Sequence, residues 1–284
     1  MPELPEVQTT VNGLNSTVRG RTIIDVSTTY ESPAFKGKDE IKNPEYFKEF
    51  RKKVKGKKIT DVERRGKNIL MHLSSGQTIL THMKMTGHYV YDRVVPHIRL
   101  DFELEKGAHL YLSDMRKFAK VTLIPTDELD KSEHLSKLGP EPLEDDFSLE
   151  DFKNRLKKRP RGKIKQVLMD PKVIAGIGNI YSDEILWRAD VHPLSSTEKI
   201  PKKNLEEMYK AMRELLKKGI LLGGDSMSDY RDIRGERGQF QEYHRAYQKH
   251  EEKCSKRGCK GVLDRLTIGA RSAHFCPKHQ KIFK

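Results

Sequence analysis

The sequence contains no stretch approaching the roughly 18 apolar residues that a helix needs to cross a bilayer. Its N-terminus also lacks the basic start and the following apolar run of a secretion signal. No internal repeat is visible along the chain. These absences argue against a helical membrane protein and predict a cytoplasmic one, with no targeting or transmembrane segment and no membrane partner.

Cysteine is scarce, and Cys254, Cys259 and Cys276 all lie near the C-terminus, where an odd number cannot pair off as disulfides. With His279 they form two close pairs separated by 16 residues. A β-hairpin zinc site needs such spacing, because each pair sits on one knuckle and the hairpin brings the knuckles together. We predict one structural Zn²⁺, since four protein ligands leave no position for a catalytic water. The alternative, buried free thiols beside an incidental histidine, is disfavoured because this tail has too few apolar residues for a core.

Acidic residues are too few to balance the basic ones. The chain has 55 Lys and Arg against 41 Asp and Glu, a formal net charge of +14 and a pI near 9.5. This imbalance predicts a polyanionic partner, with a merely solvated basic surface as the alternative. Two basic runs stand out, at residues 51–58 and 152–165, and each could face either a nucleic acid or solvent.

The hydrophobic pattern divides the chain into a β-rich part and a helical part. Residues 3–14 carry apolar side chains at helical spacing. Seven short, often alternating runs follow within about a hundred residues, which favours a β-sandwich or barrel. The acidic residues 126–146 contain LGPEPLEDD and are expected to form a linker. The seven strand-like runs are residues 22–30, 58–65, 68–73, 77–85, 98–104, 109–114 and 119–124.

Beyond the linker the pattern is helical. An apolar stripe at helical spacing runs from Leu205 to Leu216. Residues 223–252 contain few apolar residues and many charges, which predicts a long mobile loop. Within residues 168–193 a helix, the glycine turn GIGNIY and a second helix follow one another. Such a helix-two-turns-helix unit can set backbone N–H groups and an Asn side chain against a phosphate, although a tight helical hairpin in an ordinary core has the same pattern.

The opening residues, MPELPE, raise a question of chemistry. Removal of Met1, which is usual before a small residue, would leave the secondary amine of Pro2 as the N-terminus, with Glu3 beside it. An α-amino group has a pKa of about 7.7–8.0 against roughly 10.4 for lysine, so Pro2 would have an appreciable nucleophilic fraction at physiological pH. The alternative is that Pro-Glu simply starts a helix, since proline suits the first turn and acids favour its positive end.

Several motifs extend this pattern along the chain: MPELPEV at 1–7, RRGKNIL at 64–70, THMKMTG at 81–87, LGPEPL at 138–143, the run 168–193 and the terminal cysteine–histidine pattern. Their order resembles that of formamidopyrimidine-DNA glycosylases over essentially the whole chain. The resemblance implies an α+β multidomain fold, with an N-terminal β-sandwich and flanking helices, then a helix-two-turns-helix domain with a β-hairpin zinc finger. The expected domains are a catalytic β-sandwich at 1–130, a linker at 131–148, a DNA-binding helix-two-turns-helix domain at 149–245 and a zinc finger at 246–284.

The resemblance also implies an activity. The expected protein is a bifunctional DNA glycosylase and abasic-site lyase of base excision repair, which excises oxidised purines such as 8-oxoguanine and formamidopyrimidines. Its expected partner is double-stranded DNA containing oxidised bases or abasic sites. It is expected to act as a monomer in a bacterial-type cytoplasm, associated with the nucleoid.

Four residues match the family's catalytic positions. Pro2 resembles the nucleophile that attacks C1′ of the damaged nucleotide and forms an iminium with the opened sugar. Glu3 resembles the general acid that assists base loss and ring opening. Lys67 matches a lysine near the scissile phosphates and the lesion. Arg271 matches the arginine that the zinc hairpin lends to the minor groove and to the second elimination.

Further residues match DNA-binding positions. Flipping a base out of duplex DNA leaves a gap, which the family fills with a methionine, an arginine and a phenylalanine; Met85, Arg116 and Phe118 match them. The chain departs from the usual pattern at Met115 and Lys117, where a proline and a second arginine are common. The positions that resemble backbone phosphate contacts are His97, Arg161, Lys165 and Asn179.

Two further departures and three rival functions accompany this resemblance. Most relatives use four cysteines with a two-residue first gap, but a site with a four-residue gap and His279 also suits zinc. Residues 223–252, where relatives carry a loop that closes over the flipped base, match least.

The rival functions are an oxidised-pyrimidine glycosylase of the same superfamily, a non-catalytic damaged-DNA-binding protein, and a zinc-ribbon protein of the ribosome or transcription machinery. The motif PELPE and the gap-filling set favour purine lesions over pyrimidine lesions. The presence of Pro2, Glu3 and Lys67 favours an enzyme over a non-catalytic binder. A zinc-ribbon protein would leave the first 190 residues without a role.

Overall fold

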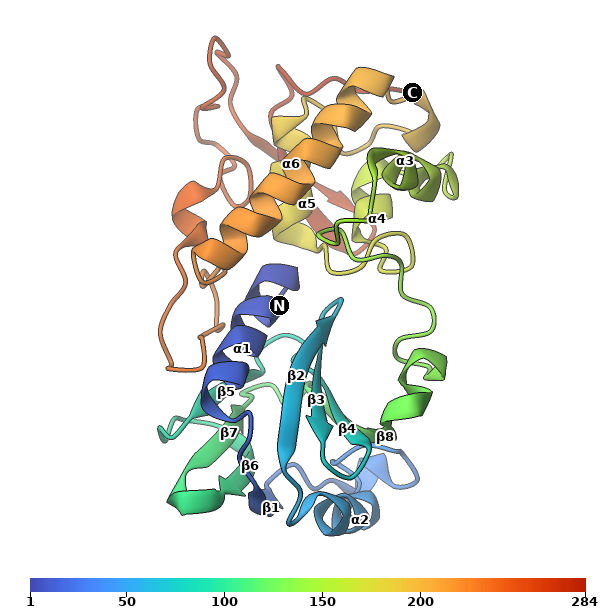
Figure 1. Ribbon diagram of the computed structural model, residues 1–284. Helices are drawn as coiled ribbons and strands as arrows, with labels where there is room; N and C mark the ends of the chain where they lie inside the picture. Colours follow the sequence, from blue (N-terminus) through green and yellow to red (C-terminus); the bar gives the residue numbers. More distant parts are fainter. The chain divides into compact units, whose positions relative to one another are not determined.

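The computed structural model describes residues 1–284, apart from the side chain of Pro33 (Figure 1). The chain divides into two compact units, residues 1–136 with 222–239 and residues 137–221 with 240–284. Segment 222–239 thus clusters with the first unit, whereas the expected boundaries kept residues 149–245 together. Among the described residues, no helix is long and apolar enough to cross a membrane.

The first unit is a sandwich of two four-stranded antiparallel sheets, in the orders β1-β6-β7-β5 and β2-β3-β4-β8. The predicted β-sandwich is therefore confirmed. The helices and strands of this unit are α1 (Leu4–Thr17), β1 (Ile23–Thr28), α2 (Pro44–Val54), β2 (Ile59–Arg65), β3 (Asn68–Leu73), β4 (Gln77–His82), β5 (His88–Tyr91), β6 (Ile98–Leu104), β7 (His109–Ser113) and β8 (Lys120–Pro125). Short 3₁₀ turns lie at Pro33–Phe35, Glu105–Gly107 and Thr126–Lys131.

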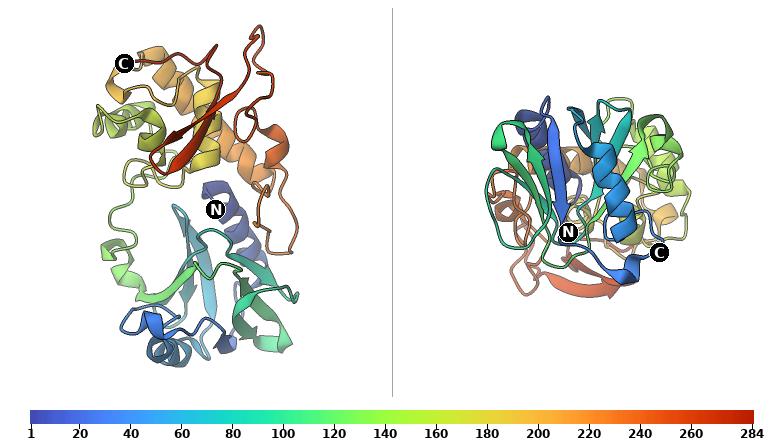
Figure 2. Two further views of the ribbon diagram at one scale, coloured as in Figure 1. Left: turned by 180° about the vertical axis from the view of Figure 1, so that it is seen from behind. Right: turned by 90° about the horizontal axis from the view of Figure 1, so that it is seen from below.

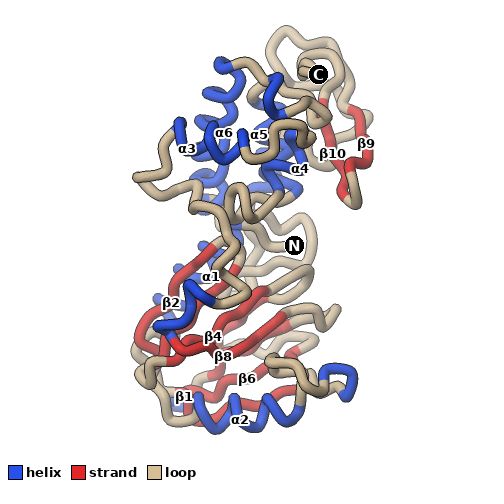
Figure 3. Tube along the Cα trace, turned by 90° about the vertical axis from the view of Figure 1, so that its right-hand side faces the viewer, coloured by secondary structure: helices blue, strands red, loops and turns tan.

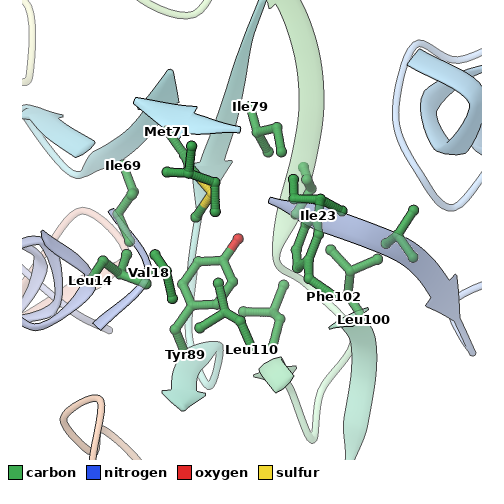
Figure 4. Packing of buried hydrophobic residues seen from close by; sticks show 14 of the residues in the cluster. Leu14, Val18, Ile23, Ile69, Met71, Ile79, Tyr89, Leu100, Phe102 and Leu110 are labelled. Carbon is green, nitrogen blue, oxygen red and sulfur yellow. The ribbon is translucent and has the colours of Figure 1, made fainter. Parts of the chain in front are cut away.

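One hydrophobic core fills the space between the two sheets (Figure 4). Both sheets contribute fully buried aliphatic side chains, and each such side chain stabilises the fold by about 1.5–3 kcal/mol relative to exposure. Tyr89 stands among them, and its hydroxyl group is satisfied by the Thr81 hydroxyl at 2.8 Å. The labelled aliphatic residues of the two sheets are Ile23, Leu100 and Leu110 on one side and Ile69, Met71 and Ile79 on the other.

The sequence pattern overlooked β5. Residues 77–85 were expected to form one strand, but β4 ends at His82 and the chain turns through residues 83–87 before β5 begins. Gly87 closes this turn, since its N–H donates to the Met83 carbonyl oxygen at 3.1 Å and a Cβ at Gly87 would lie 2.5 Å from that oxygen. The turn carries Met85 out of the sheet.

Segment 222–239 has no helix or strand. The sequence predicted a mobile loop here, but two of its few apolar side chains are buried, Tyr230 at 3% exposure and Ile233 at 4%. Ile233 packs so closely on α1 that a Cβ at Gly13 would lie 2.4 Å from it. The Tyr230 hydroxyl donates to the Glu6 carbonyl oxygen at 3.0 Å. The stretch is a loop, as expected, but part of it packs against α1, and its mobility stays a prediction.

The second unit contains the predicted helices and hairpin. Helix α5 packs against α4, α6 and β10, and Figure 2 shows the red β9–β10 hairpin running along the yellow α5. Strands β9 and β10 pair antiparallel. Among the described residues of this unit, Figure 3 shows no other strand. The elements of this unit are α3 (Leu149–Lys157), α4 (Ile164–Met169), α5 (Asn179–Arg188), α6 (Lys202–Leu221), β9 (Asp264–Ile268) and β10 (Arg271–Phe275), with 3₁₀ turns at Thr197–Lys199 and Phe240–Tyr243.

Candidate functional site

The N-terminus leads directly into α1. Pro2 is buried, and Glu3 is the N-cap residue of the helix. The Glu3 backbone N–H donates to Glu6 Oε2 at 2.7 Å, as in a capping box. The helix start therefore fixes the place of Pro2, so the two interpretations of the opening residues are compatible. While Met1 is attached, the Pro2 nitrogen belongs to a planar peptide bond and is not nucleophilic.

Glu6 is a buried acid that sequence reasoning missed. Its Oε1 accepts the Asp225 N–H at 2.8 Å, so the carboxylate joins the start of α1 to segment 222–239. Gly224 permits this approach, because a Cβ there would lie 2.9 Å from Glu6 Cγ. The pKa of Glu6 is raised to about 7: burial is the largest cause, the charge of Glu3 adds to it, and the two backbone N–H donors oppose both. The sequence does contain an indication of this role, because an acid three residues after the N-cap residue Glu3 is typical of a capping box.

This pKa predicts how stability depends on pH. The Glu6 pKa is about 7 in the folded protein and 4.5 when unperturbed, so the folded state holds the proton more tightly. The free energy of unfolding should therefore fall by about 3 kcal/mol as pH rises from 4.5 to 7, and this contribution should be constant above 7. Urea unfolding of the native protein and of Glu6→Gln across this range isolates the effect. Parallel pH profiles for the two proteins would contradict it.

Lys67 lies in the turn between β2 and β3, next to Gly66, which has a positive φ of 59°. Arg64 connects this turn to α1, since its guanidinium donates to Gln8 Oε1 at 2.9 Å and to the Gly66 carbonyl oxygen at 3.1 Å. The start of α1 and the turn that carries Lys67 thus lie side by side. Burial, then the charges of Lys84 and Lys67, lower the pKa of His82 to about 3. These cations make the end of the sheet suitable for a phosphate.

Asp114 organises the DNA-binding candidates of the first unit. It is fully buried. Its carboxylate accepts the Tyr30 hydroxyl at 2.7 Å, the Thr86 hydroxyl at 2.5 Å and the Ala119 N–H at 2.8 Å, and its own N–H donates to the His97 carbonyl oxygen at 3.0 Å. This carboxylate therefore fixes three loops at once. Sequence reasoning passed over it, although it begins the motif DMRKF.

The loops that carry the predicted gap-filling residues meet at this network. Thr86, next to Met85, accepts the Arg116 N–H at 3.1 Å and so ties the two loops together. The Arg116 guanidinium lies 4.7 Å from the centre of the Phe118 ring. Phe118 is 47% exposed, so its ring is accessible to a partner. Met85 is half-buried and Arg116 is exposed.

Lys165 does not reach the surface, contrary to the expected phosphate contact. It is 1% exposed, and its ammonium donates to Asp183 Oδ1 at 2.6 Å, to the Ser182 hydroxyl at 2.9 Å and to the Asn179 carbonyl oxygen at 2.8 Å. An ammonium has three protons, and all three are used. The reason for the error is that a basic run does not reveal which of its members points inward.

Asn179 and Arg271 are brought close by the hairpin. Asn179 is the first residue of α5, and its side-chain amide donates to the Ser272 hydroxyl at 3.3 Å. Arg271 is exposed at the start of β10, directly before Ser272. Arg161 is exposed in the turn before α4. The first-turn N–H groups of a helix favour an anion, so these positions suit a phosphate backbone.

The predicted metal ligands converge. The ligand atoms of Cys254, Cys259, Cys276 and His279 all lie within 4.8 Å of one another. The Cys259 and Cys276 sulfurs are 3.6 Å apart, close to the roughly 3.8 Å that two sulfurs adopt around a tetrahedral zinc ion with bonds of about 2.3 Å. Gly261 is required beside them, because a Cβ there would lie 2.6 Å from the Cys276 sulfur. The cluster is consistent with a metal site.

The neighbours of His279 orient it for coordination. Its Nε2 lies 3.2 Å from the Trp187 carbonyl oxygen, an acceptor, so Nε2 carries the proton. Nδ1 then faces the Cys254 sulfur at 3.3 Å with its lone pair available. Burial lowers the pKa of His279, which favours the neutral ring that a metal ligand requires. Trp187, the one tryptophan of the chain, packs edge-on against His279.

Comparison with known proteins agrees with this geometry. Residues 1–121 match the formamidopyrimidine-DNA glycosylase N-terminal domain, and residues 138–231 match the H2TH domain of the same enzymes. The formamidopyrimidine-DNA glycosylase of Pelotomaculum thermopropionicum is 37% identical over 99% of this chain and its own full length. The chain belongs to the formamidopyrimidine-DNA glycosylase family.

Solved structures of this family share its fold. The MutM (Fpg) protein of Thermus thermophilus is 33% identical, with a TM-score of 0.84 over 97% of each chain. The Lactococcus lactis Fpg, solved in complex with DNA containing an abasic site, is 32% identical, with a TM-score of 0.85 over 97% of this chain and 98% of its own. The fold class predicted from the motifs is confirmed. A zinc-ribbon protein of the ribosome or transcription machinery is excluded, because the matches span the whole chain.

Proposed function

We propose that this chain is a bifunctional DNA glycosylase and abasic-site lyase that removes oxidised purines, 8-oxoguanine and formamidopyrimidines, from double-stranded DNA. One observation carries the proposal: Pro2 and Glu3 are fixed at the start of α1, beside the turn that carries Lys67. The whole-length membership of the formamidopyrimidine-DNA glycosylase family supports it.

The reaction begins once Met1 has been removed. The Pro2 nitrogen attacks C1′ of the damaged nucleotide, the bond from C1′ to the base breaks, and Glu3 supplies a proton that assists base loss and ring opening. The sugar then remains joined to Pro2 as an iminium, which acidifies the C2′ proton. Loss of that proton expels the 3′ phosphate, and a second elimination expels the 5′ phosphate. Lys67 and Arg271 neutralise the phosphates at these steps.

The DNA is held by both units of the chain. In the first unit His97 contacts the backbone, and Met85, Arg116 and Phe118 fill the gap that the flipped nucleotide leaves. In the second unit Arg161 and the first turn of α5 at Asn179 bind phosphates. Cys254, Cys259, Cys276 and His279 would hold one structural Zn²⁺, which would order the hairpin. The protein acts as a monomer.

The substrate class is tested directly. Purified protein is incubated with otherwise identical duplexes that contain 8-oxoguanine, a formamidopyrimidine or an oxidised pyrimidine, and base release and strand cleavage are followed separately. Faster release of the two purine lesions is expected. Faster release of the pyrimidine would favour the related pyrimidine glycosylases, and binding without release would favour a non-catalytic binder.

The gap-filling role predicts different losses on different substrates. Flipping a base out of a stacked duplex costs a few kcal/mol, so Phe118→Ala should slow excision of 8-oxoguanine from duplex by at least about tenfold. Cleavage at a preformed abasic site should slow much less. Met115→Ala is the matched control, because Met115 lies in the same loop with 50% exposure against 47% for Phe118. Equal losses on both substrates would show that Phe118 serves only packing.

The two basic runs should differ in their effect on the salt dependence of DNA binding. In the run 51–58, Arg51 and Lys55 are bound by Asp25, with Arg51 Nε 2.7 Å from its Oδ1. This run also precedes β2, whereas Lys67 follows it, so the two lie at opposite ends of that strand. Each phosphate contact contributes about 0.9 to the slope of log affinity against log salt. Arg161→Gln should flatten the slope by about this amount. Lys53→Gln should leave the slope unchanged. A flatter slope for Lys53→Gln, with no change for Arg161→Gln, would place the run 51–58 on the DNA.

A further inference from the structure

Asp183 lies at the centre of a buried polar network in the second unit. It is 1% exposed, and each of its carboxylate oxygens has partners. Oδ1 accepts the Lys165 ammonium at 2.6 Å, while Oδ2 accepts both the backbone N–H and the ring Nδ1–H of His274, each at 3.0 Å. Lys165 and His274 are also buried, at 1% and 4% exposure. The network therefore joins three elements, α4, α5 and β10, without solvent.

The spacing of these contacts sets β10 along α5. Asn179 and Asp183 are four residues apart on α5, which places them on one face about 6 Å apart. Ser272 and His274 are two residues apart on β10, so they point to the same side of the strand, about 6.6 Å apart. The two intervals match, and each pair is hydrogen-bonded, Asn179 to Ser272 and Asp183 to His274. Two matched contacts fix both the position and the direction of the strand.

Arg271 is oriented by the same arrangement. It precedes Ser272, so its side chain points to the opposite side of β10 from Ser272 and His274. The hairpin turn is fixed as well, since a Cβ at Gly269 would lie 2.9 Å from the Gln166 side-chain nitrogen on α4. The metal cluster lies beyond the other end of β10, at Cys276. The buried network thus holds the end of the hairpin that carries Arg271.

We propose that Asp183 and Lys165 are positioning residues for DNA binding, which align the β9–β10 hairpin with the first turn of α5 so that Arg271 and Asn179 contact DNA together. This inference rests on the proposed function. Lys165 acts through Asp183: its charge keeps the buried carboxylate ionised and paired, because a lone charge would be costly to bury. The pair thus acts on DNA without touching it.

The test uses the full-length, metal-loaded protein and a duplex containing a stable abasic-site analogue, so that binding is measured without chemistry. Asp183→Asn keeps the shape of the side chain but removes its charge and places an N–H₂ group toward Lys165 or His274. Misalignment should weaken the contact of Arg271 with DNA, so affinity should fall between about tenfold and a hundredfold. Zinc content should be unchanged. A control in the same helix is Arg188→Gln, since Arg188 pairs with exposed Glu214 at the far end of α5.

A double-mutant cycle separates positioning from stability. If Asp183 acts through Arg271, then adding Arg271→Ala to Asp183→Asn should cause little further loss of affinity. The combined Lys165→Met and Asp183→Asn variant guards against misfolding, because it leaves no unpaired buried charge. It should recover thermal stability relative to Lys165→Met alone, while its affinity stays below that of the native protein. The inference would be overturned if either Asp183 variant bound the duplex with native affinity, or if the losses from Asp183→Asn and Arg271→Ala were additive. If the native protein itself failed to bind the duplex, the proposed function would be overturned instead.

Discussion

Protein that keeps Met1 will neither cleave DNA at an abasic site nor form a borohydride-stable adduct with it. Pro2→Gln produces such protein, because the initiator methionine is removed before small residues and kept before a large one. The Pro2 nitrogen is the proposed nucleophile, and behind Met1 the nitrogen at position 2 is an amide without a free lone pair. Removing a nucleophile costs on the order of a thousandfold or more in rate. Strand cleavage and adduct formation on denaturing gels measure the effect.

The matched control is Pro2→Ala. Alanine is small, so Met1 is removed and a primary α-amine, with a pKa of about 7.7–8.0, takes the place of the proline nitrogen. This variant should keep measurable lyase activity and trapping. Both variants should bind an abasic-site duplex, because the DNA-binding residues lie elsewhere. Full activity in Pro2→Gln protein that mass spectrometry shows to retain Met1 would exclude Pro2 as the nucleophile.

Loss of the metal site should have the second largest effect. Cys276→Ser removes a ligand that is fully buried, and metal binding in so small a cluster is coupled to local folding. DNA affinity should fall by about tenfold to a hundredfold, because the unfolded hairpin no longer holds Arg271 against the DNA. The two sheets should remain folded, since their core does not include the cysteines. Zinc analysis and DNA titration check both points, and Trp187 fluorescence reports the local change, because this residue packs against the cluster.

Two further variants assign the loss to the hairpin. His279→Cys restores the four-cysteine set that is usual in the family, so it should keep both zinc and affinity. Arg271→Ala should keep zinc and lose most of the affinity, since it removes a DNA contact and leaves the ligands in place. Zinc-free Cys276→Ser protein that binds lesion DNA with native affinity would remove the hairpin from the mechanism.

Periodicity and motif spacing predicted much of the fold, because these features depend on local physics. The helix at the N-terminus follows from apolar residues at helical spacing, and the sandwich follows from seven alternating runs. Strand β5 was missed because it has only four residues and follows a turn whose first residues, 83–85, were taken as part of the preceding strand. The convergence of the three cysteines and His279 was predicted correctly, since ligand spacing in a hairpin is a local property too.

The networks around the site were not predictable in the same way. Asp114 accepts a hydrogen bond from Tyr30, and Glu6 accepts one from the backbone N–H of Asp225. In both pairs the two residues are far apart in the sequence, so no local sequence pattern indicates the contact. The burial of Lys165 could not be predicted from the sequence either. Only its packing against α5 distinguishes it from the exposed basic residues of the run 152–165. Residues within recognisable motifs could be inferred from the sequence, whereas the buried groups that support them required the three-dimensional structure.

The central claim is that the reacting amine is the nitrogen of Pro2. The most direct test is to trap the protein on a duplex containing 8-oxoguanine with borohydride, digest the adduct with protease and locate the modified residue by mass spectrometry. The account predicts that the sugar fragment is attached to an N-terminal peptide that begins at Pro2 and lacks Met1. A fragment attached to a lysine, Lys67 included, with Pro2 unmodified would contradict it.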